Sequence, residues 1–266
     1  MSERNLFNVI ALIVVGVLFS ALIFANERYK IFSSDRFEST GARVTAYAWL
    51  AVFVFGITGI IVSSSKQSMS KQELTTVPFW QLFVLHIILV FFLVGWWLLS
   101  RRPPIRQFLN LLPAEPLNAT ALGVAVGVGG WAITLSIAVA VGLILHSLGM
   151  IPKDLQPPAA VPWMAALPFW QKGLIILSAM TVEEAFFRGF LQKRIGLVLS
   201  TIAFALAHAG YGEPLMLIGI TVVSVIIGIT FYRTKNLIPC IVAHGVFDAI
   251  QLFVVIPLAV SAGGLG

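Results

Sequence analysis

Residues 169–189 read FWQKGLIILSAMTVEEAFFRG, and this stretch decides the fold. It is mainly apolar over about 20 residues, the length at which a helix crosses the hydrocarbon core of a bilayer. It nevertheless carries Glu183, Glu184 and Arg188. Because a charge at the bilayer centre costs roughly 2.5 to 3.5 kcal/mol, such residues need a partner or a chemical role. The stretch therefore predicts a membrane helix that contributes polar groups to a site inside the bilayer.

The composition of the whole chain agrees with a membrane protein. Of the 266 residues, 59% are apolar and 11% are charged, whereas a soluble domain has roughly 25% charged residues. These values exclude a water-soluble monomer and a disordered chain. Cys240 is the only cysteine, which excludes an internal disulfide. The net charge of +6 comes from lysines and arginines scattered through short loops, so we interpret it as membrane topology and expect no nucleic-acid partner.

Apolar runs long enough to form membrane helices recur along the chain. We expect eight spans and an all-α, polytopic transmembrane bundle. The predicted spans cover residues 6–25, 44–63, 77–99, 119–146, 169–192, 196–209, 214–232 and 237–258. The first run ends in Phe24-Ala25-Asn26 rather than a small-x-small cleavage site, so it is predicted to be a retained span and not a signal peptide.

Basic residues are distributed unevenly between the two sides of this predicted bundle. Leaving out Arg188, eleven lysines and arginines fall in the loops after spans one, three, five and seven, and five fall on the opposite side. Because cytoplasmic loops are rich in Lys and Arg, both termini are predicted outside. We therefore expect an integral multi-pass protein of the cell membrane, in contact with the lipid bilayer, whose site opens toward the cytoplasm.

A proline-rich segment divides the chain. Residues 151–168 contain five prolines and Trp163, which disfavours a continuous helix and favours an interfacial connection. We expect about four spans in residues 1–150, about four more in a catalytic core at residues 169–258, and a short tail at residues 259–266. Most ionisable groups inside spans follow the connection, so the chemistry is expected in the second half.

The spacing of the polar residues sorts them into pairs. Glu184 and Arg188 are four residues apart with the acid first, the favourable order for an ion pair on one helix face. Glu183 is rotated about 100° away from Glu184 and must find its partner on another helix. His244 and Asp248 are also four apart and share one face of the last span.

The depths of these groups in the bilayer are similar. At 1.5 Å per residue from the cytoplasmic helix ends, Glu183 lies about 15 Å deep and His208 about 17 to 20 Å. His244 lies about 10 Å deep and Asp248 about 16 Å. The four side chains therefore come from three helices but occupy one layer, which predicts a solvated site in the cytoplasmic half of the bundle.

The residue types in this layer favour attack by water. We expect no serine or cysteine nucleophile at this depth. Glu183 is the natural base, because desolvation makes a carboxylate more ready to take a proton. His208 could help to position the water. His244 could donate to the oxyanion of a tetrahedral intermediate, and Asp248 could orient His244 or, if protonated, donate as well.

These residues resemble the motifs of the type II CAAX prenyl endopeptidase family, also called the CPBP or Abi family of membrane proteases. The family patterns Glu-Glu-x-x-x-Arg, Phe-x-x-x-His and His-x-x-x-Asn/Asp lie on successive helices. Here they begin at Glu183, at Phe204 and at His244, and the last one ends in Asp248, where the prenyl-endopeptidase branch has Asn. The resemblance covers roughly residues 168–256.

The resemblance implies an intramembrane glutamic endopeptidase. Glu183 and His208 would activate water, while His244 and its partner Asp248 would stabilise the oxyanion. Glu184 and Arg188 would be structural support. The implied substrate is a membrane-associated peptide or lipidated protein, with prenylated CAAX proteins as one class, and no cofactor is implied.

Other polar or small residues have simpler interpretations. Gln81 and His86 are predicted to bond across helices, with a place in the cavity wall as the alternative for both. Gly123 and Gly127 form a Gly-x-x-x-Gly pattern that indicates close helix packing. Cys240 is predicted to be an inert packing thiol.

Two other classes of function remain open from the sequence. Glu183, His208, His244 and Asp248 could instead bind zinc in a metal-dependent protease, although no His-Glu-x-x-His helix is present. Alternatively, the polar cluster could only organise helices in a non-enzymatic scaffold or immunity-type protein, or it could couple protons in a transporter. No inverted repeat supports transport.

Overall fold

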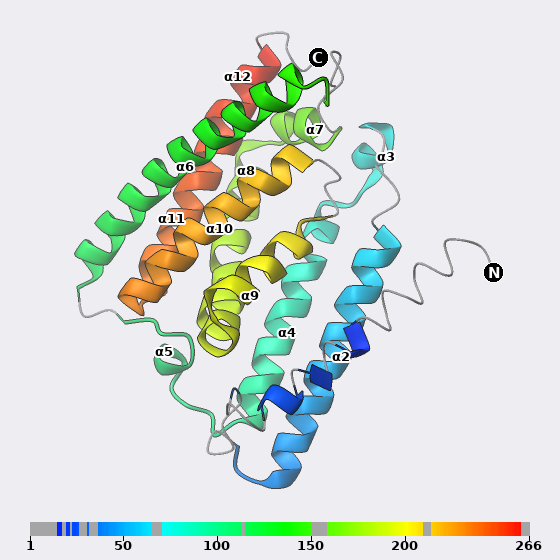
Figure 1. Cartoon of the computed structure of the whole chain (residues 1–266), viewed down its shortest axis with the longest axis vertical. Helices are drawn as coiled ribbons and strands as arrows, with labels where there is room; N and C mark the ends of the chain where they lie inside the picture. Colours follow the sequence, from blue (N-terminus) through cyan, green and yellow to red (C-terminus); the bar gives the residue numbers. More distant parts are fainter. Residues whose placement is uncertain are drawn as a thin grey trace, which may run out of the picture.

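The computed structural model describes residues 15–17, 20–21, 23–26, 31, 37–64, 71–112, 115–150, 159–209 and 214–261. In these residues the protein is all-α, and the one β-type pairing is an isolated bridge between Phe37 and Ser100. The predicted first span, residues 6–25, lies largely outside the described residues. Figure 1 shows the helices as a bundle, with α6 (Pro116–Ser147), α10 (Pro214–Thr234) and α11 (Ile238–Ile250) on one side and α2 (Thr40–Ser64) and α4 (Val84–Leu99) on the other.

The long helices are α2 (Thr40–Ser64), α4 (Val84–Leu99), α6 (Pro116–Ser147), α8 (Phe169–Ser178), α9 (Lys193–Ala207), α10 (Pro214–Thr234) and α11 (Ile238–Ile250). The shorter ones are α3 (Lys71–Thr76), the 3-10 helix η2 (Phe79–Phe83), α5 (Ile105–Phe108), α7 (Ala160–Ala166), the π-helices η3 (Ala179–Glu183), η4 (Ala185–Gln192) and η6 (Gln251–Val255), and α12 (Ile256–Ser261). Prolines stand at or near several helix starts, as at Pro116 and Pro239, because the first turn needs no backbone N–H partner.

The described part of the chain contains six helices long and apolar enough to cross a membrane, fewer than the eight predicted. These are Thr40–Ile60, Phe79–Leu99, Pro116–Ser147, Phe169–Ala207, Leu215–Thr234 and Ile238–Ser261. The chain is therefore an integral multi-pass membrane protein. The numbers differ because the first run is mostly not described and because runs 169–192 and 196–209 are joined in one helical segment.

This joined segment changes direction at Gly196. The residue has φ 81° and ψ 177°, a conformation that side-chain-bearing residues rarely adopt. Figure 1 shows the chain leaving the end of the α8 segment and returning along α9. Two arms of one apolar segment thus lie side by side, and α9 packs against η4.

The helix that carries the two glutamates is not a regular α-helix. It continues from α8 into the π-helices η3 and η4. Near its onset the hydroxyl of Thr181 donates to the carbonyl of Leu177 at 2.6 Å, so a side chain competes with the backbone ladder there. Wider π turns change which way successive side chains face, and they recur at functional sites.

Aromatic packing holds η4 against α4. The ring of Phe190 lies 5.2 Å from that of Phe92 and 5.2 Å from that of Trp96, both in edge-on geometry. All three side chains are at most 1% exposed. Edge-on aromatic pairs add stabilisation beyond the area they bury. This cluster therefore packs η4, in the second half of the chain, against α4, in the first half.

Glycines allow α6 and α11 to approach closely. A Cβ atom at Gly123 would lie 2.6 Å from Cβ of Val242, and one at Gly127 would lie 2.7 Å from Cβ of Val246. Real Cβ atoms essentially never come this close, so the contact requires glycine. The packing role predicted for the Gly-x-x-x-Gly pattern is confirmed (Figure 1).

The proline-rich connection is described from residue 159 onward. It contains α7, which has seven residues and is too short to span a bilayer. Lys172 of α8 is buried and donates from Nζ to the carbonyl of Ala165, near the end of α7. This bond satisfies one of the carbonyls that the end of a helix leaves without a partner.

Candidate active site

Glu184 is fully buried, and its charge is neutralised by an arginine of the same helix. Its Oε1 lies 3.1 Å from Nη1 of Arg188, which confirms the predicted ion pair. The other terminal nitrogen of the guanidinium, Nη2, donates to the carbonyl oxygen and the hydroxyl of Ser224 at 3.2 and 3.1 Å. The guanidinium also lies over the ring of Phe204, 4.6 Å from its centroid. The buried arginine therefore links η4 to α10 and α9.

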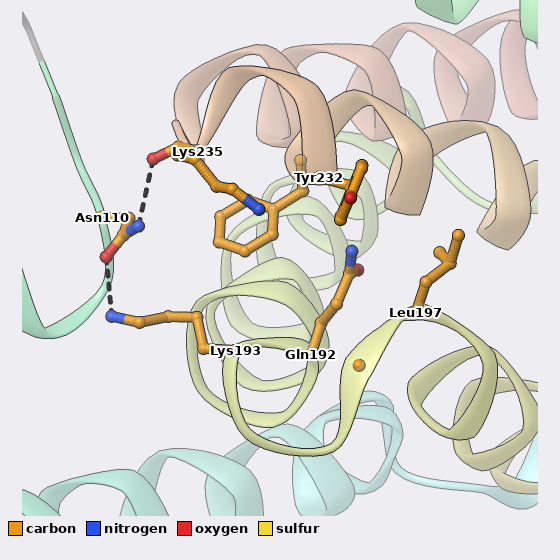
Figure 2. A pocket seen from close by; sticks show the side chains of 8 residues that line it. Asn110, Gln192, Lys193, Leu197, Tyr232 and Lys235 are labelled. Atoms are coloured by element: carbon orange, nitrogen blue, oxygen red, sulfur yellow. Dashed lines mark hydrogen bonds between the residues drawn. The ribbon is translucent and has the colours of Figure 1, made fainter.

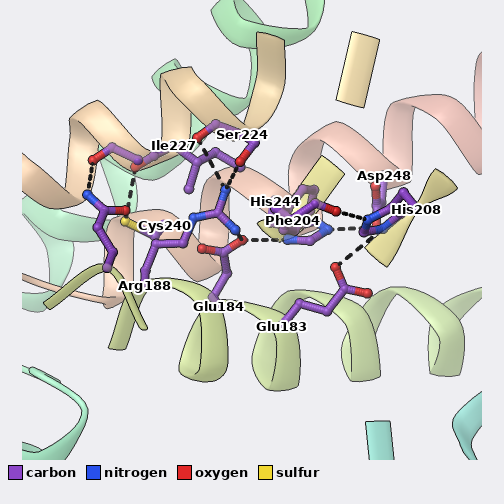
Figure 3. Close-up of polar contacts among 12 residues, drawn as sticks. Glu183, Glu184, Arg188, Phe204, His208, Ser224, Ile227, Cys240, His244 and Asp248 are labelled. Carbon is purple, nitrogen blue, oxygen red and sulfur yellow. Dashed lines mark hydrogen bonds and ion pairs between the residues drawn. The ribbon is translucent and has the colours of Figure 1, made fainter. Parts of the chain in front are cut away.

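Glu184 also binds His244 on α11. The Nδ1 atom of His244 lies 2.7 Å from Oε1 of Glu184, and because a carboxylate only accepts, Nδ1 is the donor. The other ring nitrogen, Nε2, lies 3.4 Å from Oδ2 of Asp248, one turn further along α11. The ring is thus held between two carboxylates, as Figure 3 shows.

Glu183 faces other partners. Its Oε1 lies 3.0 Å from Nε2 of His86 on α4, and its Oε2 lies 3.7 Å from Nε2 of His208. His208 donates from Nδ1 to the carbonyl of Phe204 at 2.8 Å, which leaves Nε2 on the side of Glu183. Oε2 of Glu183 has no hydrogen-bond partner among the described residues. Adjacent glutamates therefore have different surroundings (Figure 3).

This constellation coincides with a family match. Residues 165–250 match the model of the type II CAAX prenyl endopeptidase Rce1-like family. This segment is an Rce1-like domain. It contains Glu183, Glu184, Arg188, His208, His244 and Asp248, so every residue predicted for the site lies within the matched part.

A curated relative matches part of the chain. The uncharacterized protein YpbD of Bacillus subtilis is 33% identical over 107 residues, which are 40% of this chain and 52% of YpbD. The chain thus spans about half the length of this relative. No solved structure matches the chain.

The six predicted site residues all lie in the Rce1-like domain, and the contacts described above divide them into two groups. Glu183 stands beside His208, while Arg188, Glu184, His244 and Asp248 form one chain of contacts. Contacts therefore join the three helices that carry these residues, and their common depth in the bilayer stays a prediction.

Two residues of the site were underestimated or missed by the sequence analysis. His86 bonds across helices as predicted, but its partner is Glu183 itself. Ser178 was not singled out from the sequence, yet it joins the site, because its Oγ lies 2.8 Å from Nδ1 of His86. The available signal was a histidine in a predicted span, 77–99, whose only other polar side chain is Gln81.

The donor set does not fit a metal centre. Within the ranges that the structure describes, no group of three or more His, Cys, Asp or Glu side chains is arranged to hold a metal ion. His244 has a carboxylate beside each of its ring nitrogens, and Nδ1 of His208 is bonded to a carbonyl. The geometry therefore gives the zinc alternative no three-ligand set.

A cavity of about 410 Å³ lies elsewhere, where η4 meets α9. It is lined by Asn110, Gln192, Lys193, Gly196, Leu197, Phe231, Tyr232 and Lys235 and contains none of the predicted site residues. In Figure 2, Asn110 bridges two lysines: it accepts from Nζ of Lys193 and donates to the carbonyl of Lys235. Nζ of Lys193 also donates to the carbonyls of Gln107 and Phe108. These bonds fasten the chain after α5 to the ends of η4 and α10.

Proposed function

We propose that the protein is an intramembrane endopeptidase in which Glu183 activates water for hydrolysis of a peptide bond. Membership of residues 165–250 in the Rce1-like family supports a membrane protease. The observation that carries the proposal is the difference between the two glutamates. Glu184 is paired with Arg188, whereas Glu183 faces two histidines, and its Oε2 makes no hydrogen bond within the described part of the chain.

The proposed reaction needs one base and one group of donors. Oε2 of Glu183 takes a proton from water, and the resulting hydroxide forms a C–O bond with the scissile carbonyl carbon. The carbonyl oxygen becomes an oxyanion. When the tetrahedral intermediate collapses, the C–N bond breaks, and the proton held by Glu183 passes to the leaving amine. His208 orients the water from the other side.

His244 is the proposed donor to the oxyanion. Nδ1 is held by Glu184, which leaves Nε2 to donate next to Asp248. With hydrogens on both nitrogens, the ring is balanced by the carboxylates on either side. Preorganised donors of this kind are often the largest electrostatic contribution to catalysis. Glu184 and Arg188 act as support, because they set the position of His244.

The substrate class follows from the family and from the position of the site within a membrane bundle. We propose a peptide bond of a membrane-associated protein, with lipidated CAAX-type proteins as one class. The bias of basic residues supports a site open to the cytoplasm, both termini outside and a location in the cell membrane. The core at residues 169–258, set apart by the 151–168 connection, would carry most of the chemistry.

The test compares wild type with Glu183→Gln in detergent, on a peptide library with and without a chelator. The control is Glu115→Gln, the same chemical change at an exposed acid. We expect Glu183→Gln to lower kcat by roughly 10²- to 10⁴-fold, the usual contribution of a general base. The control should cleave like wild type, with or without chelator.

Each other result has a defined meaning. Loss of wild-type activity on chelation would replace the proposal with a zinc mechanism. Full activity of Glu183→Gln, with an unchanged thermal melt, would refute Glu183 as the base. Absence of cleavage by wild type on the library and on lipidated CAAX peptides would favour the scaffold alternative.

A further inference from the structure

His86 connects the first half of the chain to the proposed base. It lies on α4, outside the matched residues 165–250. Its Nε2 is 3.0 Å from Oε1 of Glu183, and its Nδ1 is 2.8 Å from Oγ of Ser178. The side chains of His86 and Glu183 are only 15% and 12% exposed. The contact is therefore a largely desolvated one, in which a hydrogen bond is strong.

The chemistry of the three groups gives these bonds a direction. An ionised carboxylate can only accept, so Nε2 of His86 carries the hydrogen and donates to Glu183. In a neutral imidazole the other nitrogen, Nδ1, is then an acceptor. A serine hydroxyl can donate, so Ser178 donates to Nδ1. The result is a chain of two bonds from Ser178 through His86 to Glu183.

These two hydrogen bonds place the two carboxylate oxygens of Glu183 in different surroundings. Oε1 is engaged by His86, while Oε2 has no partner among the described residues and lies 3.7 Å from Nε2 of His208. A carboxylate that is held by one oxygen cannot rotate freely. The bond to His86 thus decides which oxygen is presented to the substrate side.

We propose that His86 is a positioning residue, which holds Oε1 of Glu183 so that Oε2 is the base, and that Ser178 fixes the tautomer of His86. This rests on the proposed function. Ser178 lies one wide turn before Glu183, at the junction of α8 and η3, so its place depends on the π-helical geometry. The working site therefore includes α4 and is incomplete in residues 165–250 alone.

The kinetic test uses variants that differ in hydrogen bonding. His86→Leu removes the donor and is expected to lower kcat by about 10- to 100-fold with little change in KM, since the residue does not touch substrate. His86→Gln keeps an N–H that can reach Oε1 and should recover much of this loss. Ser178→Ala should lower kcat by about 3- to 10-fold. His146→Leu, the same change at an exposed histidine, is the control.

A spectroscopic test detects the hydrogen bonding of the Glu183 carboxylate and does not depend on cleavage of a substrate. Infrared spectra of the full chain in nanodiscs should contain a carboxylate band that disappears in Glu183→Gln and is thereby assigned. We expect this band to shift in His86→Leu and to stay unchanged in His146→Leu. If the wild type cleaves nothing, the proposed function fails, but this readout still decides whether His86 holds Glu183.

Three results would overturn the inference. The first is an unchanged Glu183 band in His86→Leu, and the second is kcat of the wild-type value in a folded His86→Leu protein. The third is complete loss of activity in Ser178→Ala together with covalent labelling of Ser178 by a fluorophosphonate. That result would make Ser178 a nucleophile with His86 as its base, and Glu183 would only orient the ring.

Discussion

Replacing Arg188 by leucine would remove the guanidinium group that pairs with the buried carboxylate of Glu184. Glu184 is fully buried, and Arg188 is 2% exposed, so water cannot take over the lost interaction. The substitution would also remove the donor to the carbonyl and hydroxyl of Ser224. His244 would remain as the donor to Glu184.

The expected loss of stability is the cost of removing one partner of a buried ion pair. Removing one partner of a buried ion pair typically costs about 3–5 kcal/mol, because the other charge is left uncompensated. We expect Arg188→Leu to lower the free energy of unfolding by that amount. The double variant Glu184→Gln/Arg188→Leu removes both charges and keeps an acceptor for Nδ1 of His244. It should lie within about 2 kcal/mol of wild type, since apolar or neutral replacement of a whole pair is often tolerated.

The assay is reversible unfolding in mixed micelles, followed by far-ultraviolet circular dichroism, on the wild type, both single variants and the double variant. The pattern that supports the reasoning is a destabilised Arg188→Leu and a double variant that is more stable than it. A double variant as unstable as Arg188→Leu would show that the arginine acts through Ser224 and Phe204 rather than through the charge of Glu184.

Two further predictions concern helix packing and the oxyanion donor. Gly127→Ala should lower the free energy of unfolding by about 1–3 kcal/mol, because its Cβ would lie 2.7 Å from that of Val246. Gly129→Ala is the matched control, since a Cβ there would meet nothing within 4 Å. Equal melting temperatures for the two variants would contradict the close approach of α6 and α11. Asp248→Asn should retain cleavage within about tenfold of wild type, whereas Asp248→Leu should lose about 100-fold or more, because the amide keeps a polar group with an acceptor oxygen beside Nε2 of His244 and leucine does not. Equal losses in both Asp248 variants, measured as kcat on the same peptide, would exclude a polar role for this position.

Local spacing predicted the contacts that form within a helix. The alignment of His244 with Asp248 follows from the 3.6 residues per turn of α11, and the pairing of Glu184 with Arg188 forms as predicted although the helix is π-helical there. Burial cost predicted that Glu183 would find a partner on another helix, as it does. The packing glycines on α6 were also evident, since small residues four apart indicate close helix approach.

Hydropathy separated the apolar runs on either side of Gly196 but carried no information on the direction that the chain takes between them. The runs before and after Gly196 are joined in one helical segment, and the turn between them depends on the backbone of that glycine. The π-helices that carry Glu183 and Arg188 have no signal in hydropathy either.

The sequence by itself determined the membrane class, the all-α fold, the residues that carry charge into the bilayer and the pairs that one helix can form. These follow from composition, burial cost and helical periodicity, which are local properties. Only the tertiary structure decided that His86 of α4 meets Glu183, that Ser178 meets His86, and that Glu184 joins Arg188 to His244. The reason is that contacts between helices depend on how each helix is rotated against its neighbours, and the packing of the whole bundle sets that rotation.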